Sequence, residues 1–361
     1  MAHLRNPVFV ATLGLVMALM FEAEITPGMS TREVVSLARI AEEAGFDRLG
    51  ISDVVFWHDC FVLLALVSQS TEKIHLGPMV TNPYSRHPAV MAGIMAALQD
   101  ASQGRAFLGI GVGAGLEQLG WNYPRPVRTL RESVVAIKSL LAGDEVNFKG
   151  ETITIENARM VGPVSPVPIS IGSRSEQVMT LAGEVADIAL VGGRSLNQKI
   201  ADDYKRWVAT GAKKAGRKPS QIEMAPRLTL CISKDGDLAR RSMKRYAAHY
   251  ATLIRHEDLV ARENGEWMKR VEAALARSTG WYFDHDRYDD PAIDELIDDS
   301  VVSRFAIAGT PEECVALTRE VLDLGFEGAS MNLAAPKRES MYEGLKETLE
   351  NSAAVLEALR S

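Results

Sequence analysis

Strand-like apolar runs alternate with stretches of helical periodicity along most of this sequence. Seven runs lie at residues 48–52, 74–77, 106–111, 168–172, 187–191, 228–232 and 328–332, and an eighth strand is expected within residues 13–25. This alternation is typical of βαβ units that build a parallel sheet. Eight units in 361 residues predict an α/β fold, a (β/α)8 TIM barrel with insertions between strands. A doubly wound sheet stays open, because alternation alone does not show that the sheet closes.

The helix expected over residues 30–44 has clear signals at both ends. Ser30 stands at the N-cap position, and Glu33 completes a capping box. Apolar residues then recur with helical spacing, and Gly45 stands where the helix should end. The segment therefore predicts an amphipathic helix directly before the second strand.

Two segments are longer than a minimal β/α unit. Residues 143–167 carry Gly and Pro signals that suggest a small hairpin. Residues 237–300 are rich in charged and aromatic residues and suggest an amphipathic helical insertion whose aromatic side chains, around 267–288, help to cover a substrate. No stretch is poor enough in apolar residues to act as a linker. We therefore expect one domain over residues 1–361 with these two insertions.

The beginning of the chain allows two interpretations. Residues 8–21 are almost entirely apolar, which is short for a membrane span but matches the core of a signal peptide. The basic flank is weak, with only His3 and Arg5, and the run passes directly into Glu22 and Glu24. We favour a barrel strand with its lead-in over a signal peptide.

The charge balance and the cysteines limit the possible partners. A formal net charge of -7 gives no general attraction to nucleic acid or to anionic lipid. Cys60, Cys231 and Cys314 are far apart in the sequence and form neither a metal-type pair nor a disulfide framework. We expect a cytoplasmic protein with reduced thiols and no metal, whose partner is a small molecule rather than a nucleic acid or a membrane.

Polar residues follow the second and third predicted strands, and barrels of this type bind ligands at strand ends. Asp53 ends the second strand and could accept hydrogen bonds from a ligand, although helix capping would explain it equally well. His58 could donate a proton, but a histidine beside a tryptophan is more often a packing residue. Thr81 and Asn82 lie in a loop rich in Gly and Pro. Their polar side chains favour a ligand site over a purely structural turn.

Glycines dominate the end of the fourth predicted strand. They stand at every second position from Gly109 to Gly115, which permits a flat or phosphorylated ligand to approach the backbone closely. No acidic strand end follows at the distance that a dinucleotide fingerprint requires. The run alone is therefore a weak signal.

The fifth predicted strand ends in Gly172-Ser173-Arg174-Ser175, which opens a helix. Backbone amides at a helix N-terminus, two hydroxyls and a guanidinium together suit a phosphate group. A plain helix cap with a surface arginine is the alternative.

Glu22 and Glu24 lie two residues apart near the end of the first predicted strand. If this segment is extended, both side chains point to one face. A carboxyl group at the mouth of a barrel would be partly desolvated, and its raised pKa would suit general acid catalysis. If the strand ends near Met20, both side chains are merely solvated.

Four segments, in this order, resemble the luciferase-like superfamily, and within it the branch that uses the deazaflavin coenzyme F420, typified by methylenetetrahydromethanopterin reductase. They are Val80-Thr-Asn-Pro-Tyr-Ser-Arg-His-Pro88, Leu108-Gly-Ile-Gly111 after Gln103-Gly-Arg105, Leu181-Ala-Gly-Glu-Val-Ala-Asp187, and Ile307-Ala-Gly-Thr-Pro-Glu312 with Leu324-Gly-Phe326. The second motif is shared with members that bind flavin mononucleotide (FMN), whereas the first is more particular to the deazaflavin branch.

The resemblance implies a cofactor that lies across the strand ends of a barrel. It also implies a non-prolyl cis peptide bond at Met79-Val80, in a bulge behind the cofactor ring. The residues implied to contact the ring system or border it are Asp53, Thr81, Asn82, Gly111, Val112 and Gly113. Those implied to hold the phosphate are Arg174, Ser175, Gln177 and Val178. Coenzyme F420 has carbon where flavin has N5, so such family members transfer a hydride and do not activate oxygen.

Two comparisons within the family shape the expected activity. The F420-dependent glucose-6-phosphate dehydrogenases carry a histidine and a glutamate where this chain has Val54 and Ala114, so sugar-phosphate oxidation by that mechanism is not expected. The reductases place a glutamate on strand one that can protonate the substrate. Glu24 is its nearest match here and Glu22 is the second.

The resemblance therefore favours an F420-dependent oxidoreductase, with a methylene-tetrahydropterin-type reductase among the candidates. An FMN-dependent monooxygenase and a cofactor-binding homologue without catalysis remain as alternatives. Barrels of this family commonly pair, so we also expect a homodimer.

Overall fold

The structure is a computed structural model that describes residues 19–113, 116–121, 123–193 and 195–361. The interpretation of residues 8–18 as a lead-in or a signal peptide therefore lies outside the described residues, and so does Ala114. Among the described residues, no helix is both long and apolar enough to cross a membrane.

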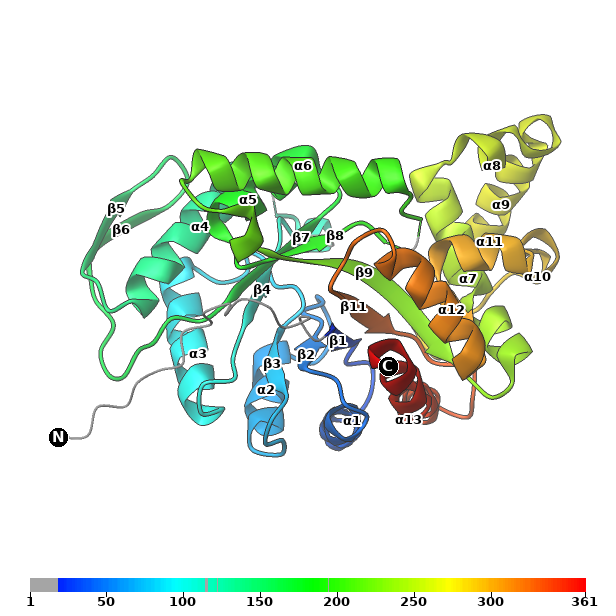
Figure 1. Ribbon diagram of the computed structural model, residues 1–361, viewed down its shortest axis with the longest axis horizontal. Coiled ribbons are helices and arrows are strands. Elements are labelled where there is room, and N and C mark those ends of the chain that lie inside the picture. The colour runs from blue at the N-terminus through cyan, green and yellow to red at the C-terminus, as the bar shows by residue number, and fades with distance from the viewer. Residues whose placement is uncertain (1–18, 114–115, 122, 194) are drawn as a thin grey trace.

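Eight parallel strands form the centre of the molecule (Figure 1). Hydrogen bonding joins them in the order β3-β2-β1-β11-β9-β8-β7-β4. Bridges between Leu76 and Ala106 and between Thr81 and Ile110 join β3 to β4 at the two ends of this order. The sheet is therefore a closed (β/α)8 barrel, which confirms the predicted fold and excludes the doubly wound sheet. The strands are β1 Met20–Ile25, β2 Arg48–Ile51, β3 His75–Pro78, β4 Leu108–Ile110, β7 Ile169–Ser173, β8 Ile188–Val191, β9 Glu223–Ile232 and β11 Gly328–Leu333.

Helices surround this barrel and bury their apolar faces against the outer side of its strands (Figure 1). The first helix begins with the predicted capping box, in which Ser30 and Glu33 bond each other's backbone amides. The surrounding helices are α1 Thr31–Glu43, α2 Cys60–Ser68, α3 Pro88–Ala101, α4 Pro126–Leu141, α5 Glu176–Val185, α6 Gln198–Lys214, α12 Pro311–Leu322 and α13 Met341–Arg360. Short 3-10 turns lie at η1 Leu116–Leu119, η2 Pro219–Gln221 and η3 Arg262–Gly265.

A small antiparallel sheet lies between α4 and β7. It consists of β5 Val146–Lys149 and β6 Thr154–Ala158. The carboxylate of Glu132 accepts hydrogen bonds from the backbone amides of Glu151, Thr152 and Ile153 in the turn between the two strands. This carboxylate thus ties the hairpin to α4.

The residues between β9 and β10 form a helical layer with a core of its own (Figure 1). Its helices are α7 Gly236–Ile254, α8 Glu257–Ala261, α9 Glu266–Arg277, α10 Ala292–Leu296 and α11 Asp299–Phe305. The chain then forms β10 Ile307–Gly309, a short strand that pairs with the far end of β9 and that the sequence did not predict. Trp267 is only 1% exposed inside this core. The expectation that it covers a substrate is therefore wrong, because its ring stabilises the layer itself.

Candidate cofactor and active site

The third strand of the barrel contains a bulge. Between the bridges Leu76–Ala106 and Thr81–Ile110 it has one residue more than β4, which is the definition of a β-bulge. The Met79-Val80 peptide bond within this bulge is cis. The resemblance implied both the bulge and the cis bond, and the structure confirms them.

Glycines on the neighbouring strands make room for this bulge. A Cβ atom on Gly50 of β2 would lie 2.4 Å from the Cβ of Met79, and one on Gly109 of β4 would lie 2.2 Å from the carbonyl oxygen of Pro78. Gly109, the first glycine of the run Gly109 to Gly115, was expected to let a ligand approach the backbone, but the bulge fills the space beside it. At Gly111 the nearest atom to such a Cβ is Cγ2 of Val80, at 3.2 Å. Val80 and Gly111 therefore form a flat wall at the strand ends.

Asp53 and Thr81 meet beside this wall. The hydroxyl of Thr81 donates to Asp53 Oδ2 at 2.6 Å, and Nη1 of Arg86 donates to the same oxygen at 2.8 Å. The other end of the Arg86 guanidinium donates to Asp59, which is the N-cap residue of α2. The carboxylate of Asp53 is thus fixed from two sides and is not a helix cap. Its remaining oxygen is the one that a ligand could use.

Asn82 has a partly structural role. Its side-chain oxygen accepts hydrogen bonds from the backbone amides of Tyr84 at 2.9 Å and Ser85 at 2.8 Å. Such a bond pattern closes an Asx turn. The carbonyl oxygen is therefore committed to the loop, and only the amide nitrogen of this side chain is left to contact a ligand.

Gly113 and Val112 continue the wall past the end of β4. Gly113 has a φ of +90°, and a Cβ atom there would lie 3.3 Å from the Cβ of Asn82. Val112 is half-buried and packs against the main core. These two residues border the loop that carries Asn82.

The turn from β7 into α5 leaves its helix end open. Ser175, the N-cap residue, makes no side-chain hydrogen bond to the first turn, and its own amide donates to the hydroxyl oxygen of Ser173 at 3.0 Å. Gly172 and Ser173 are half-buried, and Arg174, Ser175 and Gln177 are exposed. The Val178 side chain is 2% exposed in the core, so only its backbone amide can face a ligand. Open amides of this kind suit an anion.

Glu24 lies on β1 with its carboxylate inside the barrel, only 2% exposed. One oxygen accepts a hydrogen bond from the Ser52 hydroxyl at 2.8 Å. The other forms an ion pair with Arg227 of β9, whose side chain is 35% exposed.

Glu22 lies two residues deeper on the same strand face, which confirms that β1 is extended through both residues. It accepts a hydrogen bond from Ser330 of β11 at 2.6 Å. Its other oxygen has no hydrogen bond to a described residue and lies 3.4 Å from Nε of Arg48. Arg48 instead donates both terminal nitrogens to Glu223.

Burial raises the pKa of Glu22 to about 7, and the attraction of Arg48 and the hydrogen bond from Ser330 only partly oppose this effect. Two nearby carboxylates, Glu24 and Glu223, raise it further by repulsion. The prediction that a strand-one carboxyl has a raised pKa is therefore confirmed for Glu22, the second of the two candidates. This residue can hold a proton at neutral pH.

His58 lies apart from these groups. It is exposed, directly before the α2 N-cap. No hydrogen bond or ion pair between described residues joins it to either glutamate of β1.

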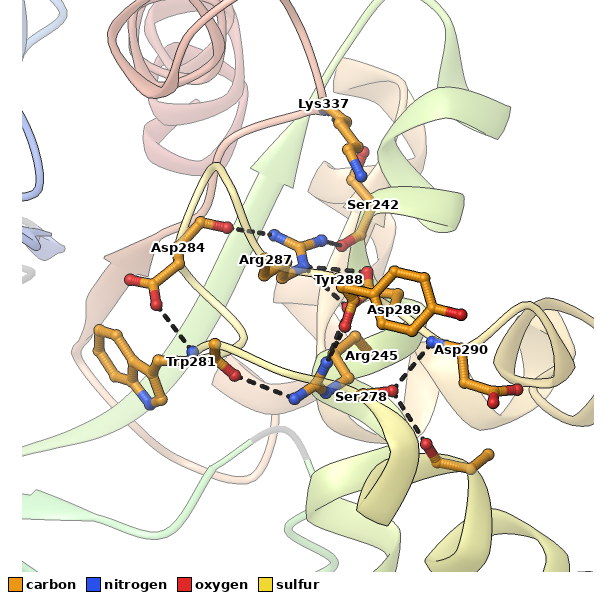
Figure 2. A network of polar contacts seen from close by, with 12 residues as sticks. Ser242, Arg245, Ser278, Trp281, Asp284, Arg287, Tyr288, Asp289, Asp290 and Lys337 are labelled. Carbon is orange, nitrogen blue, oxygen red and sulfur yellow. Dashed lines mark hydrogen bonds and ion pairs between the residues drawn. The ribbon is translucent and has the colours of Figure 1, made fainter.

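A loop of the helical layer, residues 278–290, reaches the strand-two loop. Figure 2 shows the polar contacts of Arg245 and Arg287 that fix this loop. Arg245 of α7 donates to Asp289 at 2.8 Å and to the carbonyl of Gly280 at 3.0 Å. Arg287 donates to the same Asp289. The Trp281 amide donates to Asp284 at 2.8 Å. The Trp281 ring then meets the edge of Trp57 with 5.7 Å between centroids.

Sequence reasoning missed three charged or aromatic residues of this region. Arg48 was assigned to the second predicted strand without a role, and Arg227 stands directly before the apolar run 228–232, so a search for apolar runs leaves it out. Tyr250 of α7 lies under the guanidinium of Arg174, 5.0 Å from ring centroid to Cζ. Its spacing of four residues from Tyr246, about one helical turn, is the signal that could have found it.

The fold and this geometry define a (β/α)8-barrel protein with a flat wall, a fixed carboxylate and an open helix end at its strand ends, which is an arrangement for a planar, phosphorylated cofactor. The model of the luciferase-like monooxygenase family matches residues 13–328. The chain belongs to this family.

Several relatives are similar over most of their length. The 5,10-methylenetetrahydromethanopterin reductase of Methanolobus tindarius is 31% identical over 307 residues, which cover 84% of this chain and 91% of the relative. The F420-dependent glucose-6-phosphate dehydrogenase of Nakamurella multipartita is 29% identical over 309 residues, 81% of this chain and 84% of the relative. The solved structure of the coenzyme F420-dependent tetrahydromethanopterin reductase from Methanopyrus kandleri has a TM-score of 0.78 and 25% identity, and the match covers 92% of this chain and 98% of that one.

Proposed function

We propose that the protein is a coenzyme F420-dependent oxidoreductase that transfers a hydride between the deazaflavin and an organic small molecule. The observation that carries this proposal is the bulge of β3, set beside the fixed Asp53–Thr81 pair. The similar proteins named above are F420-dependent or are methylenetetrahydromethanopterin reductases. A methylene-tetrahydropterin-type substrate is therefore the first class to test.

The described residues fit this cofactor. Met79 and Val80 with Gly111, Val112 and Gly113 would support the ring, because the missing side chains leave a flat wall there. Asp53, Thr81 and Asn82 would contact polar atoms of the cofactor from the side. When bound, coenzyme F420 supplies a carbon centre that gives or accepts a hydride.

The open turn before α5 would hold the phosphate of the cofactor. Gly172 and Ser173 lead into it, and the amides of Ser175, Gln177 and Val178 lie at or near the uncapped helix end. Arg174 adds a positive charge that a phosphate would pair with.

Glu24 and Glu22 are the proposed acid residues of strand one. Glu24 is nearer to the strand end and pairs with Arg227, whereas burial raises the pKa of Glu22 to about 7. We propose that Glu22 is the proton-holding member of this pair and that Glu24 orients the substrate end of this network. His58 is kept as a third candidate that would act only if the substrate reaches the exposed strand-two loop.

Trp57 and Trp281 would cover the substrate from the side of the helical layer. Their edge-to-face contact joins two loops that are far apart in the sequence. The ion pairs around Asp289 hold Trp281 in this place. Both insertions would then belong to one domain that spans residues 1–361.

We further propose that the protein is a cytoplasmic homodimer. Its three cysteines are free and buried, which suits a reducing compartment. Val62 and Leu66 on α2 and Val90 on α3 are exposed apolar residues on neighbouring helices, with 61%, 44% and 55% of their surface accessible. Such a face suits a second copy of the chain, and light scattering on the purified protein would test this.

A substrate screen without oxygen tests the activity. Candidate substrates, beginning with methylene-tetrahydropterins, are mixed with reduced F420 and the protein, and the return of the oxidised F420 absorbance is followed. We expect substrate-dependent oxidation that Glu24→Gln slows. If F420 binds but Glu24→Gln, Glu22→Gln and His58→Ala leave every measured turnover unchanged, the non-catalytic interpretation is supported.

A further inference from the structure

Tyr250 is a half-buried tyrosine of α7 that no motif of the sequence singled out. Its ring lies 4.4 Å from that of Tyr246, between centroids, and 6.2 Å from that of Tyr282. The guanidinium of Arg174, at the open turn before α5, lies over its face. The side chain is therefore placed between the helical layer and the strand ends of the barrel.

Two positive charges act on the phenol of Tyr250. Burial by itself would raise the pKa of this phenol, but the charges of Arg227 and Arg174, together with hydrogen bonds to Arg174 and Tyr246, outweigh burial and lower the pKa below its ordinary value. Arg227 comes from β9 and is the ion-pair partner of Glu24. Tyr250 thus stands next to the residue that fixes the strand-one carboxylate.

The neighbouring titratable groups differ from Tyr250. Burial raises the pKa of Tyr246, whose hydroxyl shares a hydrogen bond of 2.7 Å with Thr229, and burial also raises the pKa of Tyr282. Burial and the charges of Arg245 and Arg174 lower the pKa of His249. Among the three tyrosines of this cluster, Tyr250 is therefore the one whose pKa is lowered.

The two carboxylates of β1 are already engaged in hydrogen bonds within the protein, so they are poorly placed to be the only proton donors to the substrate. Glu24 uses one oxygen for Ser52 and the other for Arg227, and Glu22 lies deeper, bound to Ser330. A hydride transfer that reduces a carbon-heteroatom double bond also needs a proton for the heteroatom. A hydroxyl beside Arg227 is in a position to give one.

We propose that Tyr250 is a further proton-transferring residue of this site, placed by α7 between Arg174 and Arg227 so that its hydroxyl meets the substrate. This inference rests on the proposed function, since reduced F420 supplies the hydride. In reduction, the substrate carbon gains the hydride and one of its bonds to a heteroatom breaks, either the π bond of a carbon-heteroatom double bond or one C–N bond of a methylene group that joins two nitrogens. The heteroatom takes the proton of the Tyr250 hydroxyl, and the phenolate, held by the two arginines, regains a proton from solvent. Oxidation reverses each step.

The first test needs no cofactor. The protein is labelled with 13Cζ-tyrosine, and the eight tyrosine resonances are followed against pH. We expect one resonance to titrate at lower pH than the others, to vanish in Tyr250→Phe, and to shift to higher pH in Arg174→Gln, which removes one of the two charges. A Tyr250 resonance that titrates together with those of exposed tyrosines would overturn the proposal.

The second test uses F420 and a substrate found by the screen. Tyr250→Phe keeps the ring under Arg174 and removes only the hydroxyl. We expect it to lower kcat by about 10²- to 10⁴-fold, the usual contribution of a proton-transferring side chain, and to remove one limb of the kcat–pH profile, while the Kd for F420 changes less than about twofold. Tyr342→Phe, on α13 and bonded to Ser36, is the matched control and should behave like wild type.

The two proposals fail in different ways. If wild-type protein does not bind F420, the proposed function is refuted. If F420 binds and is turned over normally by Tyr250→Phe with an unchanged pH profile, only the role of Tyr250 is refuted.

Discussion

Glu22→Gln should remove a pH-dependent loss of stability from the barrel. Burial raises the pKa of Glu22 from 4.5 in an unfolded chain to about 7, so the folded protein binds this proton more tightly than the unfolded chain does. Between these two pH values the folded state holds more protons, and its free energy of unfolding therefore falls as the pH rises. The group stabilises the fold fully below the lower value, and this contribution is lost by the time the pH passes the upper one.

The size of the effect follows from the same two values. One unit of pKa corresponds to about 1.4 kcal/mol, so the span from 4.5 to about 7 corresponds to on the order of 3 kcal/mol. Burial makes the largest contribution to this span, Glu24 on β1 and Glu223 on β9 add to it, and Arg48 on β2 and Ser330 on β11 reduce it. Glutamine keeps the shape and cannot ionise, so in Glu22→Gln this loss of stability should be absent.

The assay is urea unfolding of wild type and Glu22→Gln at about pH 5 and about pH 8, with m-values compared to check that the unfolded states match. We expect the difference in unfolding free energy between the two proteins to move by about 2–3 kcal/mol in favour of Glu22→Gln at the higher pH. Glu145→Gln, which changes an exposed glutamate, should show no such movement. A wild-type-to-variant difference that is equal at both pH values would refute the reasoning.

Three further substitutions test other parts of the site. Gly50→Ala places a Cβ 2.4 Å from that of Met79. It should lower the free energy of unfolding by about 1–3 kcal/mol and weaken F420 binding. Gly93→Ala is the control: Gly93 lies inside α3 with free space at its Cβ position, so this change should stabilise the protein in the same urea assay. Thr81→Val removes the hydrogen bond to Asp53. It should raise the Kd for F420 about tenfold, since hydrogen bonds to charged groups contribute roughly 1.5–3 kcal/mol. An unchanged Kd would contradict a role of the Asp53–Thr81 contact in F420 binding. Asp289→Asn deprives Arg245 and Arg287 of their shared carboxylate. It should raise KM more than it lowers kcat, and tryptophan fluorescence should change as Trp281 leaves Trp57. Equal KM values for the wild type and the variant would show that the loop does not cover the substrate.

The alternating elements of the barrel could be predicted because their signals are local. The capping box at Ser30 and Glu33, the periodicity of α1 and the apolar run of β2 each lie within a few neighbouring residues, and the structure contains all three. The short β10 could not be found in this way, because its three residues form a strand only by pairing with the extension of β9.

Charged residues on the inner face of the barrel misled the search for strands. β9 begins at Glu223, five residues before the predicted start, because Glu223 and Arg227 point into the barrel, where Arg48 and Glu24 neutralise them. A rule based on apolar runs excludes such residues. Their partners come from distant strands, so only the closed sheet shows that the charges are paired.

The candidate site was predicted with uneven success for a related reason. The contact between Asp53 and Thr81 follows from the rule that polar residues at neighbouring strand ends lie close together. The bulge was predicted only from the family resemblance, since no local sequence pattern indicates it. Tyr250 was missed because its neighbours Arg174 and Arg227 lie 76 and 23 residues away in the sequence.

Equilibrium titration of the purified protein with oxidised F420 and with FMN, followed by fluorescence, tests the central claim most directly. We expect saturable micromolar or tighter binding of F420, weakened by Thr81→Val, and clearly weaker binding of FMN. Micromolar binding of FMN without binding of F420 would contradict it and would favour the oxygen-dependent monooxygenase.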